Sequence, residues 1–122
     1  MDDDEDIQTL FAINLAKLGF DAIFANDGVE AIAIFRDSLK TNQAIDLVIL
    51  DLSIPGGMGG KEAAEKILAI DPKAKLIVSS GNAYGPEMLN YSDYGFKAVF
   101  EKNFNLEEMR KVFSEVILYD GA

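Results

Sequence analysis

The sequence predicts an α/β fold, a doubly wound parallel sheet in which apolar strands alternate with amphipathic helices along the whole chain. Two observations carry this prediction. Residues 45–50 contain a single polar residue, Asp46, which is typical of a strand covered on both faces by helices. Helical spacing of apolar residues returns between the predicted strands, as it does in βαβ units. We therefore expect polar side chains at the strand ends to gather at one edge of the sheet.

In the first part of the chain, the elements are predicted from periodicity and from the residues that end helices and strands. Residues 7–18 have helical spacing of apolar side chains, and Gly19 follows them as a C-cap. A short strand is expected over residues 20–25. A turn at residues 26–28 then leads into a second amphipathic helix over residues 29–40.

The second part of the chain continues the alternation. The expected strands cover residues 45–51, 74–80 and 97–102, and the expected helices cover residues 61–70, 86–94 and 106–118. The helix over residues 86–94 is the shortest and weakest of these. Asn105 is a suitable N-cap for the last helix, and Glu107 and Glu108 suit its positive end. No repeat or linker is visible, so we expect a single domain over residues 1–122.

The composition excludes several classes of protein. The chain has 122 residues, of which 49% are apolar and 26% charged, as in ordinary globular domains. It contains no Cys and no His, which excludes disulfides, thiolate zinc sites and Ser-His-Asp catalysis. The net charge of −10 argues against a nucleic-acid partner. The absence of a long apolar stretch and the acidic N-terminus argue against a membrane span and a signal peptide, so we expect a cytoplasmic domain with no membrane partner.

Three predicted strands end on a residue that could take part in chemistry, namely Asp51, Ser79 and Lys102. A parallel sheet brings such strand ends to one edge. The acidic residues 2–6 add carboxylates just ahead of the first predicted helix. Mg²⁺ prefers such oxygen ligands, and a nearby lysine and hydroxyl suit a phosphoryl group whose charge must be neutralised.

With these residues in this order, the sequence resembles the response-regulator receiver domains of two-component signalling, from Asp2 to about Leu118. The shared features are an acidic pair before the first helix, an apolar strand ending in Asp with a proline and glycines after it, a Ser at the next strand end and a Lys at the last. The segments DLSIPGGMGGKEA and IVSSGNA look most like those of receivers fused to sensor histidine kinases. The resemblance implies a chemotaxis-regulator-like, flavodoxin-like sheet of strand order 2-1-3-4-5.

The resemblance also implies roles for individual residues. Asp51 would be the phosphoacceptor, Ser79 the hydroxyl that follows the phosphoryl group, and Lys102 its ion-pair partner. Asp2 and Asp3 would be the acidic pair.

A Mg²⁺ site follows from the same resemblance. Its ligands would be the carboxylates of Asp3 and Asp51 and the backbone carbonyl of Ser53, with Asp2 assisting through water.

The implied function is that of a phosphorelay. A phosphoryl group would pass from a phosphohistidine on a histidine kinase or phosphotransfer protein to Asp51, which fits a chain that has no histidine of its own. The phosphorylated domain would then bias the face made by the last two helices and the last strand toward a downstream output domain or protein. The chain would be a phosphoryl acceptor rather than an enzyme, with self-dephosphorylation at most, and could form part of a hybrid kinase.

Two other functions and several simpler interpretations stay open. A Mg²⁺-dependent phosphatase of the haloacid-dehalogenase type also uses an Asp at a strand end, but it needs a second Asp two residues later, where this chain has Ser53. A degenerate receiver would serve only as a protein-interaction module. Asp51 could also be a turn carboxylate, Lys102 a surface charge, and residues 2–6 a solvated acidic terminus.

Two positions near the last strand differ from the family pattern. Asn103 stands where the family has proline after a bond that is usually cis, and a cis bond to a residue other than proline costs ~3 kcal/mol. Val99 occupies the place of the family's aromatic reporter. Phe100 is adjacent, but it should point to the opposite face of the sheet.

The family's first strand would precede Asp2, where the sequence has only Met1. This strand is central in the order 2-1-3-4-5, so its absence would leave unpaired edges inside the sheet. We expect a domain that is truncated at its N-terminus relative to the family, with the strand supplied by preceding residues of a longer parent. A second interpretation is exchange between copies, with the apolar residues 116–120 (VILYD) as the surrogate strand.

Overall fold

The computed structural model describes residues 1–81, 84–102 and 105–118 of the chain. In chain order, these residues form α1 (Glu5–Lys17), α2 (Gly28–Lys40), β1 (Val48–Asp51), α3 (Gly60–Ile70), β2 (Leu76–Ser80), α4 (Pro86–Leu89), the 3-10 helix η1 (Tyr91–Tyr94), β3 (Ala98–Glu101) and α5 (Leu106–Leu118). The peptide bond between Lys102 and Asn103, which is usually cis in the family, lies outside the described residues.

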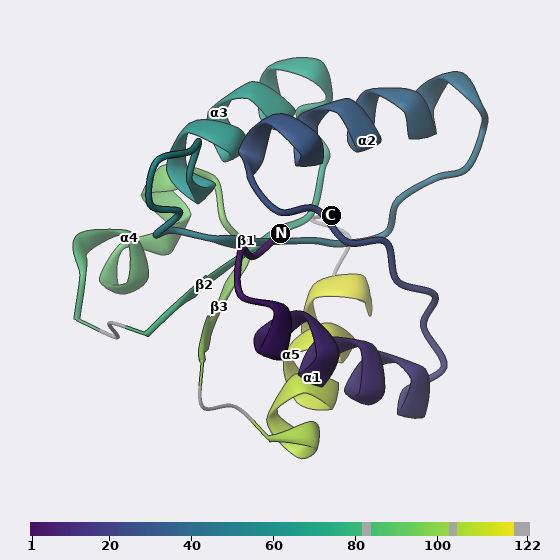
Figure 1. Cartoon of the computed structure of the whole chain (residues 1–122), viewed down its shortest axis with the longest axis vertical. Coiled ribbons are helices and arrows are strands. Elements are labelled where there is room, and N and C mark those ends of the chain that lie inside the picture. Colours follow the sequence, from purple (N-terminus) through teal and green to yellow (C-terminus); the bar gives the residue numbers. More distant parts are fainter. Residues whose placement is uncertain (82–83, 103–104, 119–122) are drawn as a thin grey trace.

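The sheet is parallel throughout and has the order β1-β2-β3. Its register places Asp51 beside Ser79 and Ser79 beside Phe100, so the carboxyl ends of the strands are level with one another. Helices α2 and α3 cover one face of the sheet, and α1 and α5 cover the other (Figure 1). The predicted doubly wound α/β fold is confirmed. None of the described helices is long and apolar enough to cross a membrane.

Two apolar clusters form the core, one on each face of the sheet. Side chains alternate along a strand, so Val78 contacts the cluster beneath α2 and α3 while its neighbour Ile77 contacts the cluster beneath α5. The same alternation places Val99 on the first side and Phe100 on the second. The Phe100 ring lies 5.6 Å from the ring of Phe113, centroid to centroid. The expectation that Phe100 faces away from Val99 is therefore confirmed.

Three helices begin at a side chain that accepts backbone hydrogen bonds. Asp4 accepts from the N–H groups of Asp6 and Ile7, which is why α1 begins two residues earlier than its apolar spacing predicts. Asp27 caps α2 in the same way. Asn105 accepts from the N–H of Glu108 at 2.9 Å, which confirms the predicted N-cap of α5.

The strand predicted over residues 20–25 is wrong, because this segment is irregular. A strand needs a neighbour with which to exchange backbone hydrogen bonds, and no such bond joins residues 20–25 to residues 45–49 in the part of the chain that the structure describes. Among the described residues, Met1 bonds to Ile49 and Asp2 bonds to Ala25 between the two segments. For the same reason, β1 begins at Val48 rather than at residue 45.

The second interpretation, in which residues 116–120 serve as a surrogate strand, is wrong in its described part, and the predicted helix over residues 106–118 is confirmed. Val116 and Ile117 belong to the last turns of α5, and they pack with the core cluster on that face of the sheet. Residues 119 and 120 lie outside the described residues.

Two glycines let the loop after β1 fold tightly against the end of that strand. A Cβ at Gly60 would lie 2.8 Å from the carbonyl oxygen of Asp51, and a Cβ at Gly59 would collide with the carbonyl oxygen of Leu52. Neither glycine has a positive φ. They are therefore needed for close approach of backbone to backbone, which brings the start of α3 against the end of β1.

We predict that Gly59→Ala lowers the free energy of unfolding by about 2 kcal/mol, because backbone atoms on both sides of the clash must move. Chemical denaturation measures the change. Gly81→Ala is the matched control, since a Cβ there meets no atom within 4 Å and the φ of Gly81 is not positive. An equal loss in both variants would contradict the steric explanation.

Candidate functional site

Asp51 is the centre of the site. It is the last residue of β1 and is only 1% exposed. One carboxylate oxygen, Oδ2, accepts a hydrogen bond from Lys102 Nζ at 2.8 Å. The other, Oδ1, accepts from the backbone N–H of Ser53 at 3.2 Å. The Asp51 carboxylate is therefore shielded from water at the edge of the sheet where the strands end.

Lys102 is shared between two buried carboxylates. Its Nζ also lies 3.3 Å from Oδ2 of Asp2, a residue that is 4% exposed. The other oxygen of Asp2 accepts from the N–H of Asp4 at 2.9 Å. One ammonium group therefore faces two carboxylates, and the pairing joins the end of β3 to the N-terminus and to β1.

The N-terminal residues are held by contacts that sequence reasoning missed. The carbonyl of Met1 accepts from the N–H of Asp51 at 3.1 Å. The side-chain amide of Gln8, on α1, donates to the carbonyl of Asp2 at 2.6 Å and to Oδ1 of Asn26 at 3.0 Å. Gln8 thus fixes the backbone of Asp2 against the loop before α2. One indication of this contact is present in the sequence: Gln8 lies one helical turn after Asp4, the residue that caps α1.

Burial and charge act in opposite directions on the site. Burial raises the pKa of Asp51, aided by the nearby charge of Asp2 and opposed by the bonds from Lys102 and Ser53. Burial alone would lower the pKa of Lys102, but the hydrogen bond and charge of Asp51, together with Asp2, outweigh it and raise the pKa. Burial lowers the pKa of the Met1 amino group, although Asp2 and Asp51 oppose the change. The site therefore keeps its lysine protonated.

Ser79 brings a hydroxyl to the same edge. It is 1% exposed, lies beside Asp51 in the register of β1 and β2, and its Oγ has no hydrogen-bond partner among the described residues. A buried hydroxyl without a partner is costly in a folded protein. Ser79 is thus available to donate to a group that binds beside Asp51.

The carboxylates fit a hard divalent cation. Asp2, Asp3 and Asp51 each offer a carboxylate oxygen within 4.8 Å of the others. Asp3 is exposed, so the cluster is open to solvent on one side. The ammonium of Lys102 pairs with Asp2 and Asp51, and Asp3 adds a third carboxylate beside them, so a cation such as Mg²⁺ would find negative charge to neutralise there. The carbonyl of Ser53 as a further ligand stays a prediction.

The residues predicted for the site therefore all lie at one edge of the sheet, and a match to a family model agrees with this arrangement. The model of the response regulator receiver domain matches residues 1–114. The chain belongs to this family. The predicted resemblance and the predicted fold class are confirmed, and the chain is a receiver domain of two-component systems.

Two curated relatives differ in how much of their length this chain covers. Sporulation initiation phosphotransferase F of Bacillus subtilis is 32% identical over 112 residues, which cover 90% of this chain and 84% of that protein. The autoinducer 1 sensor kinase/phosphatase LuxN of Vibrio campbellii is 29% identical over 111 residues, which cover 90% of this chain and 12% of that protein. The receiver is thus nearly all of one relative and a small part of the other.

A solved structure has the same fold. The receiver domain of the sensor histidine kinase PA1611 of Pseudomonas aeruginosa, solved with a magnesium ion coordinated in its active-site cleft, is 23% identical. The alignment covers 96% of this chain and 93% of that one, with a TM-score of 0.80. The likeness supports the receiver fold described above.

We predict that Asp51→Asn raises the thermal midpoint at pH 7 by a few degrees and that the gain shrinks toward pH 4. A raised pKa means that the folded state binds the proton more tightly, so the contribution of Asp51 to stability is full below the ordinary carboxyl pKa of about 3.9. That contribution is lost as the pH rises through the raised value. The exposed Asp46, in Asp46→Asn, is the control. A midpoint lowered at pH 7 would contradict the prediction.

Proposed function

We propose that this receiver domain accepts a phosphoryl group on Asp51 from the phosphohistidine of a histidine kinase or phosphotransfer protein. The observation that carries the proposal is the buried Asp51 carboxylate at the end of β1, with Lys102 Nζ at 2.8 Å. Membership of the receiver family supports the same role. The chain has no histidine, so the donor belongs to another domain or protein.

The transfer is written as an in-line displacement at phosphorus. A carboxylate oxygen of Asp51 forms the new O–P bond while the N–P bond of the phosphohistidine breaks, and the electron pair of that bond stays on the imidazole nitrogen. The products are an acyl phosphate on Asp51 and a histidine in the donor. That histidine is neutral when one of its two ring nitrogens carries a proton. Lys102 holds the Asp51 carboxylate in place before the transfer. After the transfer, its ammonium lies beside the negative charge of the new phosphoryl group.

Mg²⁺ is the cofactor that we propose for this reaction. The carboxylates of Asp3 and Asp51 and the carbonyl of Ser53 would hold it, with Asp2 assisting through water. When bound, Mg²⁺ supplies positive charge for the phosphoryl oxygens. Asp2, Asp3 and Asp51 offer oxygens within 4.8 Å of one another, which supports this assignment.

Ser79 links phosphorylation to the output surface in this proposal. Its unpartnered Oγ donates to a phosphoryl oxygen on Asp51, which draws in the loop that follows β2. That loop leads to α4, so the shift biases the face made by α4, β3 and α5 toward a downstream output domain or protein. Phe100 packs against Phe113 of α5, on the face opposite to Val99, and the proposal therefore assigns the signal to the Ser79 hydroxyl and not to rotation of an aromatic ring.

Phosphoryl uptake tests the proposed function. The chain is incubated with acetyl phosphate with and without Mg²⁺, and intact mass is measured. We expect one phosphoryl group per chain that depends on Mg²⁺, and none on Asp51→Asn. The matched control is Asp46→Asn, which changes an exposed carboxylate on the segment leading into β1 and should be phosphorylated like the wild type.

The other outcomes identify the alternatives. Equal uptake by Asp51→Asn and wild type would refute the assignment of the phosphoacceptor. Sustained release of phosphate from a phosphate monoester such as p-nitrophenyl phosphate would indicate a phosphatase. No uptake and no binding of beryllofluoride would indicate a receiver that acts only as an interaction module.

We predict that Asp3→Ala weakens Mg²⁺ binding about tenfold, because an exposed carboxylate ligand is lost while the buried pair of Asp51 and Lys102 is kept. Isothermal titration calorimetry measures the affinity. Asp6→Ala removes an exposed carboxylate in the first turn of α1 and is the control. Unchanged affinity in Asp3→Ala would show that Asp3 is not a ligand.

A further inference from the structure

A hollow of about 470 Å³ opens at the carboxyl edge of the sheet, between the start of α3 and the start of α4. Ser53 lines it, and the N–H of Ser53 donates to the Asp51 carboxylate at 3.2 Å. Ser80, the neighbour of Ser79, also lines it. We call this space the α3–α4 hollow. It therefore adjoins the ends of β1 and β2, which carry Asp51 and Ser79.

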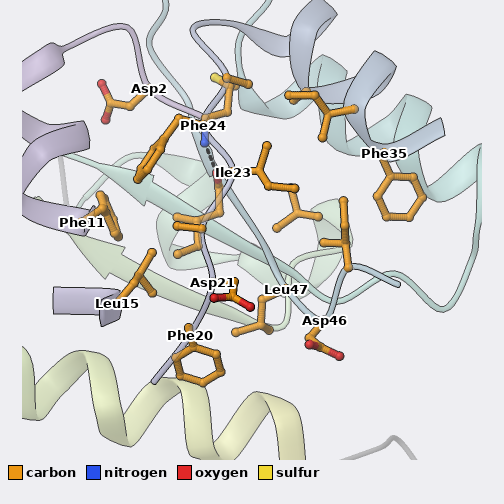
Figure 2. Close-up of a pocket in the computed structure, with 18 of the residues that line it drawn as sticks. Asp2, Phe11, Leu15, Phe20, Asp21, Ile23, Phe24, Phe35, Asp46 and Leu47 are labelled. Atoms are coloured by element: carbon orange, nitrogen blue, oxygen red, sulfur yellow. Dashed lines mark hydrogen bonds between the residues drawn. The ribbon is translucent and has the colours of Figure 1, made fainter. Parts of the chain in front are cut away.

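A larger cavity lies along β1 but leads away from this edge. Its volume is about 630 Å³, and Figure 2 shows it with Asp2 at one end and with Asp21 and Asp46 at the other. Phe11 of α1 forms part of its apolar wall (Figure 2). A group that reaches Asp51 from beyond the carboxyl end of β1 would enter the α3–α4 hollow and not this cavity.

Three charged side chains line the α3–α4 hollow, namely Lys61, Glu62 and Glu87. Two of them have contacts elsewhere. Lys61 Nζ lies 5.3 Å from the centroid of the Tyr94 ring, and a carboxylate oxygen of Glu62 lies 3.9 Å from Lys66 Nζ. Glu87 is half-buried, and in the part of the chain that the structure describes it makes no hydrogen bond or ion pair. Glu87 is thus free to accept a hydrogen bond from a group that enters the hollow.

The helix to which Glu87 belongs gives little reason for an acid at this position. Glutamates in the first turn of a helix commonly interact with the positive end of the helix dipole. Helix α4, however, has only four residues, and its N-cap Gly85 makes no side-chain hydrogen bond. A single turn has a small dipole, so the stability of α4 does not account for a half-buried carboxylate beside the site.

We propose that the α3–α4 hollow holds the imidazole ring of the phosphohistidine donor in its protonated form, and that Glu87 accepts a hydrogen bond from the ring N–H. An imidazole ring is flat, with apolar faces and with N–H groups only at its edge. Leu52 and Pro86 supply apolar surface in the hollow, and Glu87 supplies the acceptor. This inference rests on the proposed function, because it names the residue that recognises the donor.

A bond from the ring to Glu87 suits the chemistry of the transfer. In the protonated donor ring, one nitrogen carries the phosphoryl group and the other carries a proton. When an Asp51 oxygen forms the new O–P bond, the N–P bond breaks and its electron pair stays on the ring nitrogen. The ring leaves as neutral imidazole with its proton still on the other nitrogen, so no proton has to move. The carboxylate of Glu87 favours the protonated ring, which is the better leaving group.

The same contact distinguishes donors by the charge of their leaving group. Protonated phosphoimidazole brings a cationic ring into the hollow, which Glu87 attracts, whereas acetyl phosphate releases the anion acetate, which Glu87 repels. Loss of the Glu87 charge should therefore slow uptake from the first donor and speed uptake from the second. Lys61, in the same hollow, acts in the opposite direction. General damage to the site would instead slow both reactions.

The test measures phosphoryl uptake by intact mass, in the presence of Mg²⁺, from phosphoimidazole and from acetyl phosphate. The pH is held at about 6.5, near the ordinary pKa of an imidazole. We expect Glu87→Gln to lower the ratio of the phosphoimidazole rate to the acetyl phosphate rate at least about fivefold, and Glu87→Lys to lower it further. Lys61→Gln should raise the ratio at least about twofold.

Glu65→Gln is the matched control, since Glu65 is an exposed carboxylate on α3 outside the lining of the hollow. Its ratio should equal that of the wild type. An unchanged ratio in Glu87→Gln, an equal change in Glu65→Gln, or an equal loss of both rates in Glu87→Gln would overturn the inference and leave the proposed function standing. No uptake from either donor by the wild-type chain would overturn the proposed function, and the inference with it.

Discussion

A carboxylate buried at the end of a strand is the constraint around which the site is built. Asp51 cannot stay ionised out of water unless positive charge and N–H donors are supplied to it. Lys102 reaches it from the end of β3 and the N–H of Ser53 from the following loop, while Asp2 takes a share of the same ammonium. Each contact requires a different segment to arrive at the same edge of the sheet. The parallel register of β1, β2 and β3 brings the ends of these strands to the same level, so the side chains that follow them can meet.

The excess of negative charge is one unfavourable feature of the site. Two carboxylates around one ammonium are tolerated, but a third, Asp3, sits at the solvent-exposed side, where repulsion is screened. The buried hydroxyl of Ser79, which has no hydrogen-bond partner in the described part of the chain, is a second unfavourable feature at the same edge. Both features are relieved by ligands that carry the opposite property: a cation for the carboxylates and an acceptor oxygen for the hydroxyl. Both features support the proposal that the site takes a cation and a phosphoryl group together.

The fold could be read from the sequence wherever local patterns decide it. The helices follow apolar spacing and capping residues such as Asp27 and Asn105, and the three strands follow apolar runs that end on polar residues. Residues 20–25 could not be predicted in this way, because their β-favouring side chains make a strand only when a neighbour supplies backbone partners. Strand formation is a property of two segments, and the sequence of one segment does not contain it.

The site divides in a similar way. The meeting of Asp51, Ser79 and Lys102 at one edge could be predicted, since a parallel sheet aligns its strand ends. The sharing of Lys102 with Asp2, the anchoring of Asp2 by Gln8 and the close approach of Gly59 to Leu52 could not, because they depend on the path of loops in three dimensions.

The most direct test of this account is an NMR titration of the Asp51 side-chain carboxyl, with and without Mg²⁺. Without Mg²⁺, burial should place the pKa of Asp51 above the ordinary range for an aspartate, and with Mg²⁺ the pKa should fall because a cation favours the ionised form. An ordinary pKa for Asp51 that does not respond to Mg²⁺ would contradict a site organised around a buried, incompletely neutralised carboxylate.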